Sequence, residues 1–235
     1  MMTERQREIT ENFKRVRENI AAAERRRGGG EVTLLAATKT VPAEDILFAA
    51  ENLGLRVAGE NKQQEFTEKY GALSGALDYQ FIGHLQTNKA KFIVGKASLI
   101  HSVDSLHLAE KIGSLASAAG IVQDVLIEIN IGREEAKSGF MPEEAAEAEA
   151  RISELPGVRT RGIMVMAPVC SEKDEYRKYF EETYSIFIDI FQKKSHNIRE
   201  YILSMGMSDS YVEAIEEGAT LVRVGSALFG KRNYR

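Results

Sequence analysis

A lysine that follows a short apolar run is the first residue of this sequence whose setting suggests chemistry. The run extends from Val32 to Ala37, between a Gly-Gly-Gly tract and Pro42, and Lys39 comes two residues after it. Such a run predicts a strand that is buried on both faces. An amine at the end of that strand is partly desolvated, which lowers its pKa and lets it attack a carbonyl. Lys39 is therefore a candidate for forming an imine with an aldehyde, although most lysines are simply solvated.

Two turns near the end of the chain suggest a phosphate site. Ser204 and Met205 begin the segment Ser-Met-Gly-Met-Ser, and Gly225 and Ser226 follow a short apolar run that contains Arg223. Small residues, hydroxyls and open backbone amides before helix N-termini favour a bound dianion. Strand alternation turns the side chain of Arg223 toward the interior. A carbonyl-reactive lysine, a phosphate cradle and an inward arginine together predict pyridoxal 5'-phosphate as the ligand.

An arginine beside this cofactor would limit its chemistry. Arg223 keeps its proton, so it would donate a hydrogen bond to an unprotonated ring nitrogen. The ring would then be a weaker electron sink than it is beside an aspartate.

These residues need a scaffold that brings distant turns together, and the chain alternates strands and helices after one amphipathic helix. That helix is expected over Thr3–Arg27, with Thr3 as its N-cap. Eight strands are expected at Val32–Ala37, Leu55–Ala58, Tyr79–Ile82, Ser98–His101, Val122–Ile131, Thr160–Val165, Tyr201–Ser204 and Leu221–Val224. Helices are expected from Pro42 to Gly54, after Asn61 to Tyr70, over Asn88–Val94, Ser105–Ala119, Pro142–Leu155 and Glu172–Lys194, from Ser208 or Asp209 to Gly218, and from Ser226.

Eight strand-helix units predict an α/β fold, a single (β/α)8 TIM barrel with an extra N-terminal helix. Residues 1–30 would be that helix and a glycine linker, and residues 31–235 would be the cofactor-binding barrel. An open doubly wound sheet is the alternative, but it favours a glycine-rich turn where this chain has Thr38-Lys39-Thr40. Barrel active sites lie at the carboxyl ends of the strands. The residues at those ends are Lys39, Glu60, Asn61, His84, Ser102, Asp104, Asn130, Met166, Ser204, Gly225 and Ser226.

Composition excludes several classes of protein. The 235 residues are 43% hydrophobic and 28% charged, with a net charge of -4, which argues against nucleic-acid and membrane-surface binding. Cys170 is the single cysteine, so an intrachain disulfide and a CxxC site are excluded. We find no stretch of ~18 apolar residues and no apolar signal segment, and we expect a cytoplasmic protein. The four histidines lack metal-ligand spacing, so no metal is expected. The sequence shows no obvious exposed apolar stripe, which favours a monomer.

Several segments resemble those of the pyridoxal phosphate homeostasis protein family, over nearly the whole chain after the first helix. They are Leu34–Thr40, Gly59–Asn61, Phe81–Lys89, His101–Asp104, Lys137–Gly139, Arg161–Met164, Leu203–Asp209 and Val222–Gly230. The resemblance implies a barrel similar to the N-terminal domain of alanine racemase, with the cofactor bound as an imine on Lys39. It also implies that Ser204, Gly225 and Ser226 hold the phosphate and that Arg223 meets the ring nitrogen. We expect Asn61, His84 and Met205 to bind the cofactor beside them, although His84 has an equally good structural interpretation.

Proteins of that family carry, buffer and deliver the cofactor, which implies a part in vitamin B6 homeostasis without efficient catalysis. Apo enzymes that depend on pyridoxal phosphate are then candidate recipients. An amino-acid racemase is the alternative, but it needs a second acid/base group, which a further domain supplies in racemases. A class I aldolase also uses a lysine imine, although its lysine usually comes from a later strand than that of Lys39. Lys137 is a second, weaker candidate for binding an aldehyde or a phosphate.

Overall fold

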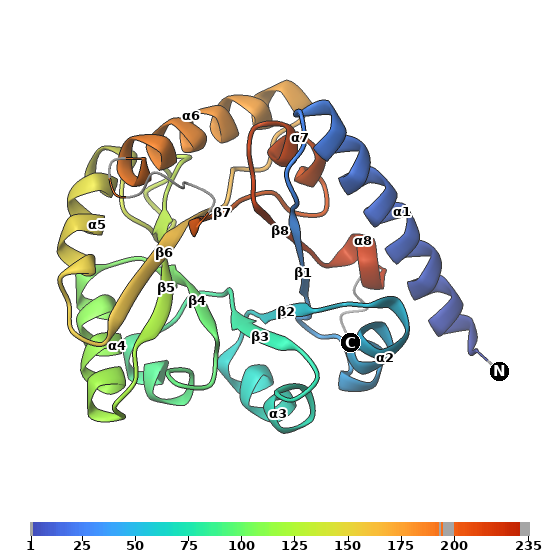
Figure 1. The fold of residues 1–235 in the computed structure, drawn as a ribbon, viewed down its shortest axis with the longest axis horizontal. Coiled ribbons are helices and arrows are strands. Elements are labelled where there is room, and N and C mark those ends of the chain that lie inside the picture. The colour runs from blue at the N-terminus through green and yellow to red at the C-terminus, as the bar shows by residue number, and fades with distance from the viewer. Residues whose placement is uncertain (1, 193, 195–199, 231–235) are drawn as a thin grey trace.

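Eight parallel strands close into a barrel in the computed structural model, which describes residues 2–192, 194 and 200–230. Each strand pairs with the next along the chain, and the last pairs with the first, so the expected TIM barrel is confirmed (Figure 1). The strands are β1 (Thr33–Ala37), β2 (Val57–Glu60), β3 (Asp78–Phe81), β4 (Leu99–Val103), β5 (Gln123–Ile129), β6 (Val158–Val165), β7 (Ile202–Ser204) and β8 (Leu221–Val224).

Helices surround the strands on the outside of the ring (Figure 1). They are α1 (Glu4–Arg26), α2 (Ala43–Leu53), α3 (Gln63–Leu73), η1 (Thr87–Phe92), α4 (Leu106–Ala118), η2 (Pro142–Glu144), α5 (Ala145–Ser153), α6 (Lys173–Phe191), α7 (Tyr211–Glu216) and α8 (Ser226–Phe229). The helix expected over Asn88–Val94 is a short 3-10 helix, η1, which buries only Ala90 and so lacks the apolar face that stabilises a longer α-helix. Among the helices of the described residues, none is long and apolar enough to span a membrane.

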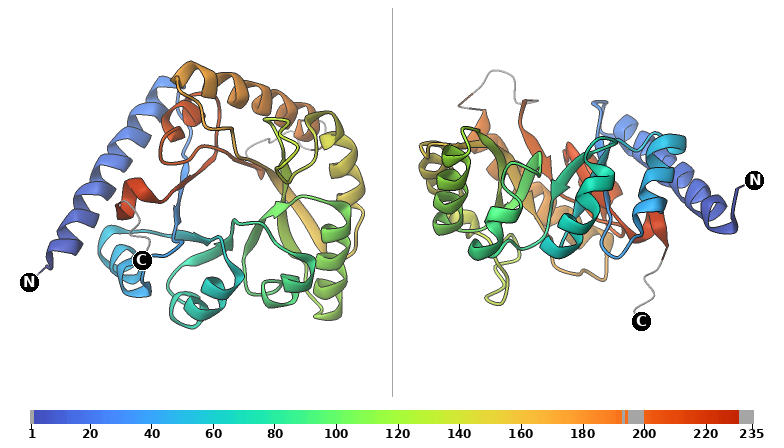
Figure 2. Two further views of the ribbon diagram at one scale, coloured as in Figure 1. Left: turned by 180° about the vertical axis from the view of Figure 1, so that it is seen from behind. Right: turned by 90° about the horizontal axis from the view of Figure 1, so that it is seen from below.

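The first helix begins as its sequence predicts and packs along the barrel. The Thr3 hydroxyl accepts a hydrogen bond from the Gln6 amide at 3.2 Å, and the Gln6 side chain accepts one from the Thr3 amide at 2.9 Å. This reciprocal capping box confirms Thr3 as the N-cap. One apolar face of α1, with Phe13 at its middle, is buried against α7, α8 and α2. The helix therefore covers the outer side of the seam where β8 meets β1 (Figure 2).

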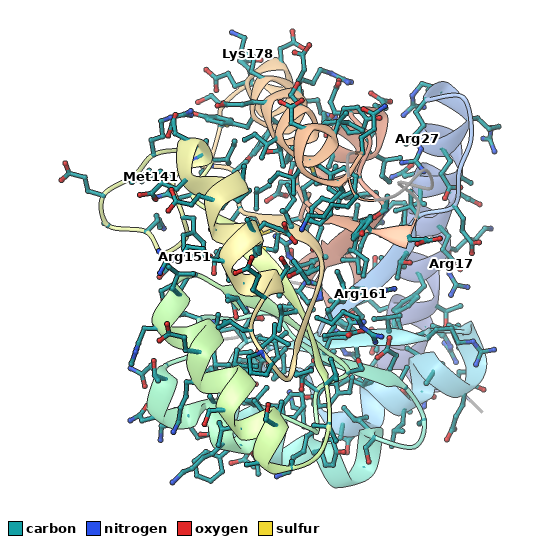
Figure 3. All side chains as sticks on the ribbon, turned by 60° about the vertical axis from the view of Figure 1, so that its left-hand side comes forward. Arg17, Arg27, Met141, Arg151, Arg161 and Lys178 are labelled. Carbon is teal, nitrogen blue, oxygen red and sulfur yellow. The ribbon has the colours of Figure 1, made fainter. Side chains whose placement is uncertain are left out.

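Polar contacts fix α1 at two further points. Arg17 donates a hydrogen bond to the carbonyl of Gly54, which ends α2, at 3.0 Å. Arg27 donates one to the carbonyl of Ala219, which precedes β8, at 2.5 Å. Both arginines are labelled in Figure 3, at different heights on the side of the molecule where α1 lies.

Side chains fill the inside of the barrel in two layers of different character. The lower layer is apolar and consists of Leu35, Leu99, Leu126, Met164, Ile202 and Leu221. Two residues further along four of these strands, on the same face, come His101, Glu128, Ser204 and Arg223, all of them buried. These four residues form a polar layer on top of the apolar one. It lies toward the carboxyl ends of the strands, where barrels place their active sites.

Candidate functional site

Lys39 lies in a tight turn directly after β1, and the side chain is half-buried. Before it, the buried Thr38 donates its amide (2.9 Å) and its hydroxyl (3.0 Å) to the carbonyl of Gly59 on β2. After it, Thr40 has a φ of 64°, in the left-handed region that residues other than glycine seldom adopt. The amide of Val41 donates a hydrogen bond to the carbonyl of Thr38 at 2.9 Å and closes the turn.

Helix α3 supplies the groups that hold this turn. The amide of Thr40 donates a hydrogen bond to Glu65 Oε2 at 2.7 Å. The Nζ of Lys69 donates to the carbonyl of Thr38 at 2.9 Å, and it also contacts Glu60 Oε2 at 2.7 Å and Glu65 Oε2 at 3.3 Å. The peptide groups before and after Lys39 are therefore both tied to α3.

Two carboxylates and one ammonium share this cluster, and burial affects them differently. Glu60 is fully buried, and burial raises the pKa of its carboxyl although Lys69 opposes the rise. Burial also acts on Glu65, but the hydrogen bond from Thr40 and the charge of Lys69 outweigh it and lower the pKa of Glu65. Glu65 therefore stays ionised near neutral pH and can accept the hydrogen bond from Thr40.

A cavity of about 380 Å³ opens beside Lys39, and residues from the first and the last described helices line it. Lys39, Gly225 and Ser226 all line it, because β1 and β8 are paired and their following turns are neighbours. Arg5 of α1 also lines the cavity, and its Nε forms an ion pair with Asp45 Oδ2 at 3.1 Å. A cationic residue near the start of the chain gives no local signal of this role, so the sequence did not predict Arg5.

The turn after β8 presents two backbone amides to a single oxygen. Gly225 and Ala227 donate their amides to Ser208 Oγ at 3.2 and 3.3 Å. A Cβ at position 225 would lie 3.0 Å from the carbonyl oxygen of Ala37, so glycine lets the turn approach β1 closely. The prediction that Ser208 or Asp209 caps α7 is wrong, because Ser210 is the residue before that helix. The Ser208 hydroxyl bonds across to the β8–α8 turn instead.

Arg223 and Ser204 meet in the polar layer. Arg223 Nη1 donates to the hydroxyl of Ser204 at 2.7 Å and to its carbonyl at 3.0 Å, and Nη2 donates to the carbonyl of Val165 at 2.9 Å. His101 Nδ1 lies 3.1 Å from the same hydroxyl, and its Nε2 lies 2.7 Å from Gln80 Oε1. The structure thus places the Ser204 side chain inside the barrel, whereas Ser208 meets the amides of the β8–α8 turn.

Burial sets the charges of this layer. It lowers the pKa of Arg223 to about 10, which leaves the guanidinium charged at neutral pH. It also lowers the pKa of His101, and the neighbouring charge of Arg223 adds to the effect, so His101 is neutral. An arginine has five N–H groups, and the hydrogen bonds above use three of them. Arg223 is not among the residues that line the cavity beside Lys39.

Glu128 is a residue of the polar layer that the sequence did not predict as part of the site. Its Oε2 atom is shielded from solvent and has no hydrogen-bond partner among the described residues. Burial, and then the nearby charge of Asp104, raise the pKa of Glu128 to about 7, while the charge of Arg223 opposes the rise. A signal was present, since a glutamate between two isoleucines in an apolar strand is an unusual choice.

The other predicted residues lie at the strand ends with contacts of their own. The amide of Asn61 donates to Glu60 Oε1 at 3.0 Å. His84 is mostly exposed, and its Nδ1 lies 3.0 Å from Asp104 Oδ2 and 3.2 Å from Ser138 Oγ. Met205 is buried, and its amide donates to the carbonyl of Leu221 at 3.2 Å. In the described part of the chain, no three His, Cys, Asp or Glu side chains gather as metal ligands. His196 lies outside that part.

Comparison with known proteins adds to this geometry. Residues 12–233 match the family model described as alanine racemase, N-terminal domain. The pyridoxal phosphate homeostasis protein of Aquifex aeolicus (strain VF5) is 45% identical over 227 residues, which cover 95% of this chain and 98% of that protein. A crystal structure of an unknown protein from Bifidobacterium adolescentis is 36% identical, with a TM-score of 0.90 and 97% of each chain covered. The structure of PipY from Synechococcus elongatus with PLP bound is 31% identical, with a TM-score of 0.79, and the match covers 94% of this chain and 100% of that one.

Proposed function

We propose that this chain, which belongs to the pyridoxal phosphate homeostasis protein family within the alanine racemase N-terminal domain family, binds pyridoxal 5'-phosphate and carries it without efficient catalysis. The observation that carries the proposal is that Lys39, Gly225 and Ser226 line one cavity. An amine and the turn whose amides would hold a phosphate therefore face the same cavity. The PLP-bound structure of PipY supports this ligand for a chain of the same fold.

The cavity fits the cofactor in size and in chemistry. Its volume of about 380 Å³ lies within the range of small-molecule pockets, which is roughly 300–1,000 Å³. The amides of Gly225 and Ala227 already converge on one oxygen atom, that of Ser208, as they would on an oxygen of a phosphate. Arg5 and Lys39 bring positive charge to a site that would take a dianion.

Each residue near the cavity then has a distinct role. When bound, pyridoxal 5'-phosphate supplies an aldehyde that a lysine amine attacks and a phosphate that backbone amides hold. We assign the aldehyde to Lys39 and the phosphate to the turn of Gly225 and Ser226. Arg223 is not among the residues that line this cavity, and its contact with the ring nitrogen stays a prediction of the family resemblance. Asn61, His84, Ser204 and Met205 stay predictions as cofactor-binding residues.

Two features favour carrying the cofactor over turning over a substrate. Lys39 is only half-buried and Ser226 is exposed, so water and other molecules reach the site. Of the described residues that line the cavity, the ionisable ones are Arg5, Lys39 and Asp45, and Arg5 pairs with Asp45. A racemase needs acid/base groups on both faces of the ring, and this lining offers one amine. Holding and releasing the cofactor requires only that amine.

The recipients belong to the same proposal. A half-open site suits transfer to apo enzymes that depend on pyridoxal phosphate, and we propose a cytoplasmic monomer in this role. Sedimentation velocity of the purified protein measures the oligomeric state directly. A dimer would remove the monomer from the proposal without affecting the binding of the cofactor.

Colour tests the proposal most directly. The wild-type protein incubated with pyridoxal 5'-phosphate is expected to be yellow, and borohydride reduction should leave the added mass on the peptide that contains Lys39. Lys39→Ala should be colourless after the same treatment. The matched control is Lys137→Ala, an exposed lysine on the loop after β5, which should stay yellow. A wild-type protein that stays colourless would contradict the proposed function, and a colourless control would move the site to Lys137.

A further inference from the structure

Helix α3 forms hydrogen bonds with the backbone on both sides of Lys39, and the proposed function does not yet account for them. The carbonyl before Lys39 belongs to Thr38 and accepts a hydrogen bond from Lys69 at 2.9 Å. The amide after Lys39 belongs to Thr40 and donates one to Glu65 at 2.7 Å. Glu65 and Lys69 lie four residues apart, on one face of α3, and contact each other at 3.3 Å.

The turn that these bonds hold has an uncommon backbone conformation. Thr40 has a φ of 64°, in the left-handed region that residues with a β-carbon seldom adopt. Its amide is at an exposed position, where water competes for the same hydrogen bond. The turn is closed by a hydrogen bond of its own, from the amide of Val41 to the carbonyl of Thr38 at 2.9 Å. The bond from the Thr40 amide to Glu65 adds a contact from outside the turn that opposes its relaxation.

The same α3 side chains also contact the buried end of β2. Lys69 also contacts Glu60 at 2.7 Å, and Glu60 is fully buried at the end of β2. The hydroxyl of Thr38 lies 3.2 Å from the same Glu60 oxygen. The cluster thus runs from a buried strand end, through α3, to the two peptide groups that flank Lys39.

We propose that Glu65 and Lys69 are positioning residues, which set the backbone conformation of the Thr38–Thr40 turn so that the Lys39 amine faces the cavity. This inference rests on the proposed function, since it assigns Lys39 the aldehyde of the cofactor. Neither residue touches the ligand in this role. Their effect on binding passes through the backbone of the turn.

The test compares three variants of α3. Glu65→Ala removes the acceptor of the Thr40 amide, Glu65→Gln keeps an acceptor oxygen, and Glu68→Ala changes an exposed glutamate of the same helix. Hydrogen exchange of the Thr40 amide, followed by NMR in the protein without cofactor, measures how firmly its hydrogen bond to Glu65 is held. Exchange of the Val125 amide, in the core strand β5, reports global stability. Titration with pyridoxal 5'-phosphate, followed by absorbance, measures the affinity.

We expect the Thr40 amide to exchange at least about tenfold faster in Glu65→Ala, because its hydrogen bond is lost. Affinity for pyridoxal 5'-phosphate should fall about tenfold, because an amine that is not held in place loses more conformational freedom when it binds the aldehyde. Glu65→Gln should restore most of the protection of the Thr40 amide and most of the affinity. Glu68→Ala should match the wild type in both. Val125 exchange should be unchanged throughout, which separates positioning from a loss of stability.

Two results would overturn the inference. One is a Glu65→Ala protein that binds the cofactor as tightly as the wild type although its Thr40 amide exchanges freely. The other is a wild-type Thr40 amide that already exchanges as fast as it does in Glu65→Ala. Failure of the proposed function looks different, since the wild-type protein would then take up no cofactor while the Thr40 amide stays protected.

Discussion

Arg223 and Ser204 are joined twice, through the Ser204 hydroxyl at 2.7 Å and its carbonyl at 3.0 Å, inside the mouth of the barrel. The same hydroxyl lies 3.1 Å from His101. Ser204 is therefore the centre of a buried network that links β4, β7 and β8. Its removal would leave polar groups without partners in a place that water reaches poorly.

Ser204→Ala should lower the free energy of unfolding by about 1–3 kcal/mol, because Arg223 and His101 each lose a buried hydrogen-bond partner. Urea unfolding at neutral pH measures the change. Ser153→Ala is the control, because that hydroxyl bonds only to the carbonyl of Ala150 at the surface and its loss should cost little. Equal stabilities for the two variants would show that the network contributes nothing.

Lys69→Met should destabilise the protein by roughly 3–5 kcal/mol at pH 8, because the fully buried Glu60 loses its cation. The loss should be smaller at pH 5. The pKa of Glu60 is raised in the folded protein, so between the unfolded and the folded pKa the native state binds more protons, and stability falls as the pH rises. Unfolding in urea at both pH values checks the sign. Lys62→Met changes an exposed neighbour of the same helix and should show no pH-dependent loss.

Glu128 should make the wild-type protein less stable as the pH rises from about 4.5 to about 7. Its pKa rises from 4.5 to about 7 on folding, so folding favours the protonated carboxyl, and this stabilising term is full below pH 4.5 and gone above pH 7. A shift of this size corresponds to roughly 3 kcal/mol as an order of magnitude. In Glu128→Gln this slope should disappear, and the variant should be the more stable protein at pH 8.

Comparison of the two proteins from pH 4 to pH 9 isolates that term, since every other titratable side chain is the same in both. Glu149→Gln is a matched control, because Glu149 is as deeply buried but forms an ion pair with Lys194. A wild type and a Glu128→Gln variant with parallel profiles would contradict the raised pKa.

The thermal stability of Ser208→Ala should depend on bound cofactor more than that of the wild type does. Without the hydroxyl, the amides of Gly225 and Ala227 lose their acceptor, which should lower the unfolding free energy of the unloaded protein by about 1–3 kcal/mol. Bound phosphate supplies acceptor oxygens for the same amides. The rise in Tm on adding pyridoxal 5'-phosphate should therefore be larger than in the wild type, by roughly 2–4 °C for each kcal/mol recovered.

Thermal melts with and without the cofactor give this difference. Ser114→Ala, on the exposed side of α4, should show the wild-type rise in Tm. If the rise in Ser208→Ala equals that of the control, the phosphate does not share the amides of Gly225 and Ala227.

Regular features of the fold could be predicted from local pattern. The bounds of β8 agree residue for residue, because Leu221–Val224 is a short apolar run between a Gly-Ala-Thr segment and a glycine. Lys39 could be found because the strand before it is equally well delimited. The eight repeats then placed its turn beside that of Gly225, which the paired strands β1 and β8 confirm.

Contacts made at long range could not be predicted. Ser208, Asp209 and Ser210 are all good capping residues, and the choice among them depends on amides 17 and 19 residues further along the chain. Glu65 and Lys69 lie on a helix that is polar almost all round. The hydrophobic pattern of the sequence therefore does not distinguish them from its other polar residues, although they bond to the turn of Lys39. Arg5 is separated from the other residues of its cavity by at least 32 positions, since the nearest is Ala37.

The position of Arg5 has a practical consequence for anyone who handles the protein. Helix α1 begins at Glu4, and its second residue already lines the cavity of Lys39. An affinity tag or fluorescent label fused ahead of this helix would be tethered at the rim of the site. A fusion there should hinder access of a ligand to the cavity. The other end of α1, at Arg26, lies about 30 Å away along the helix axis.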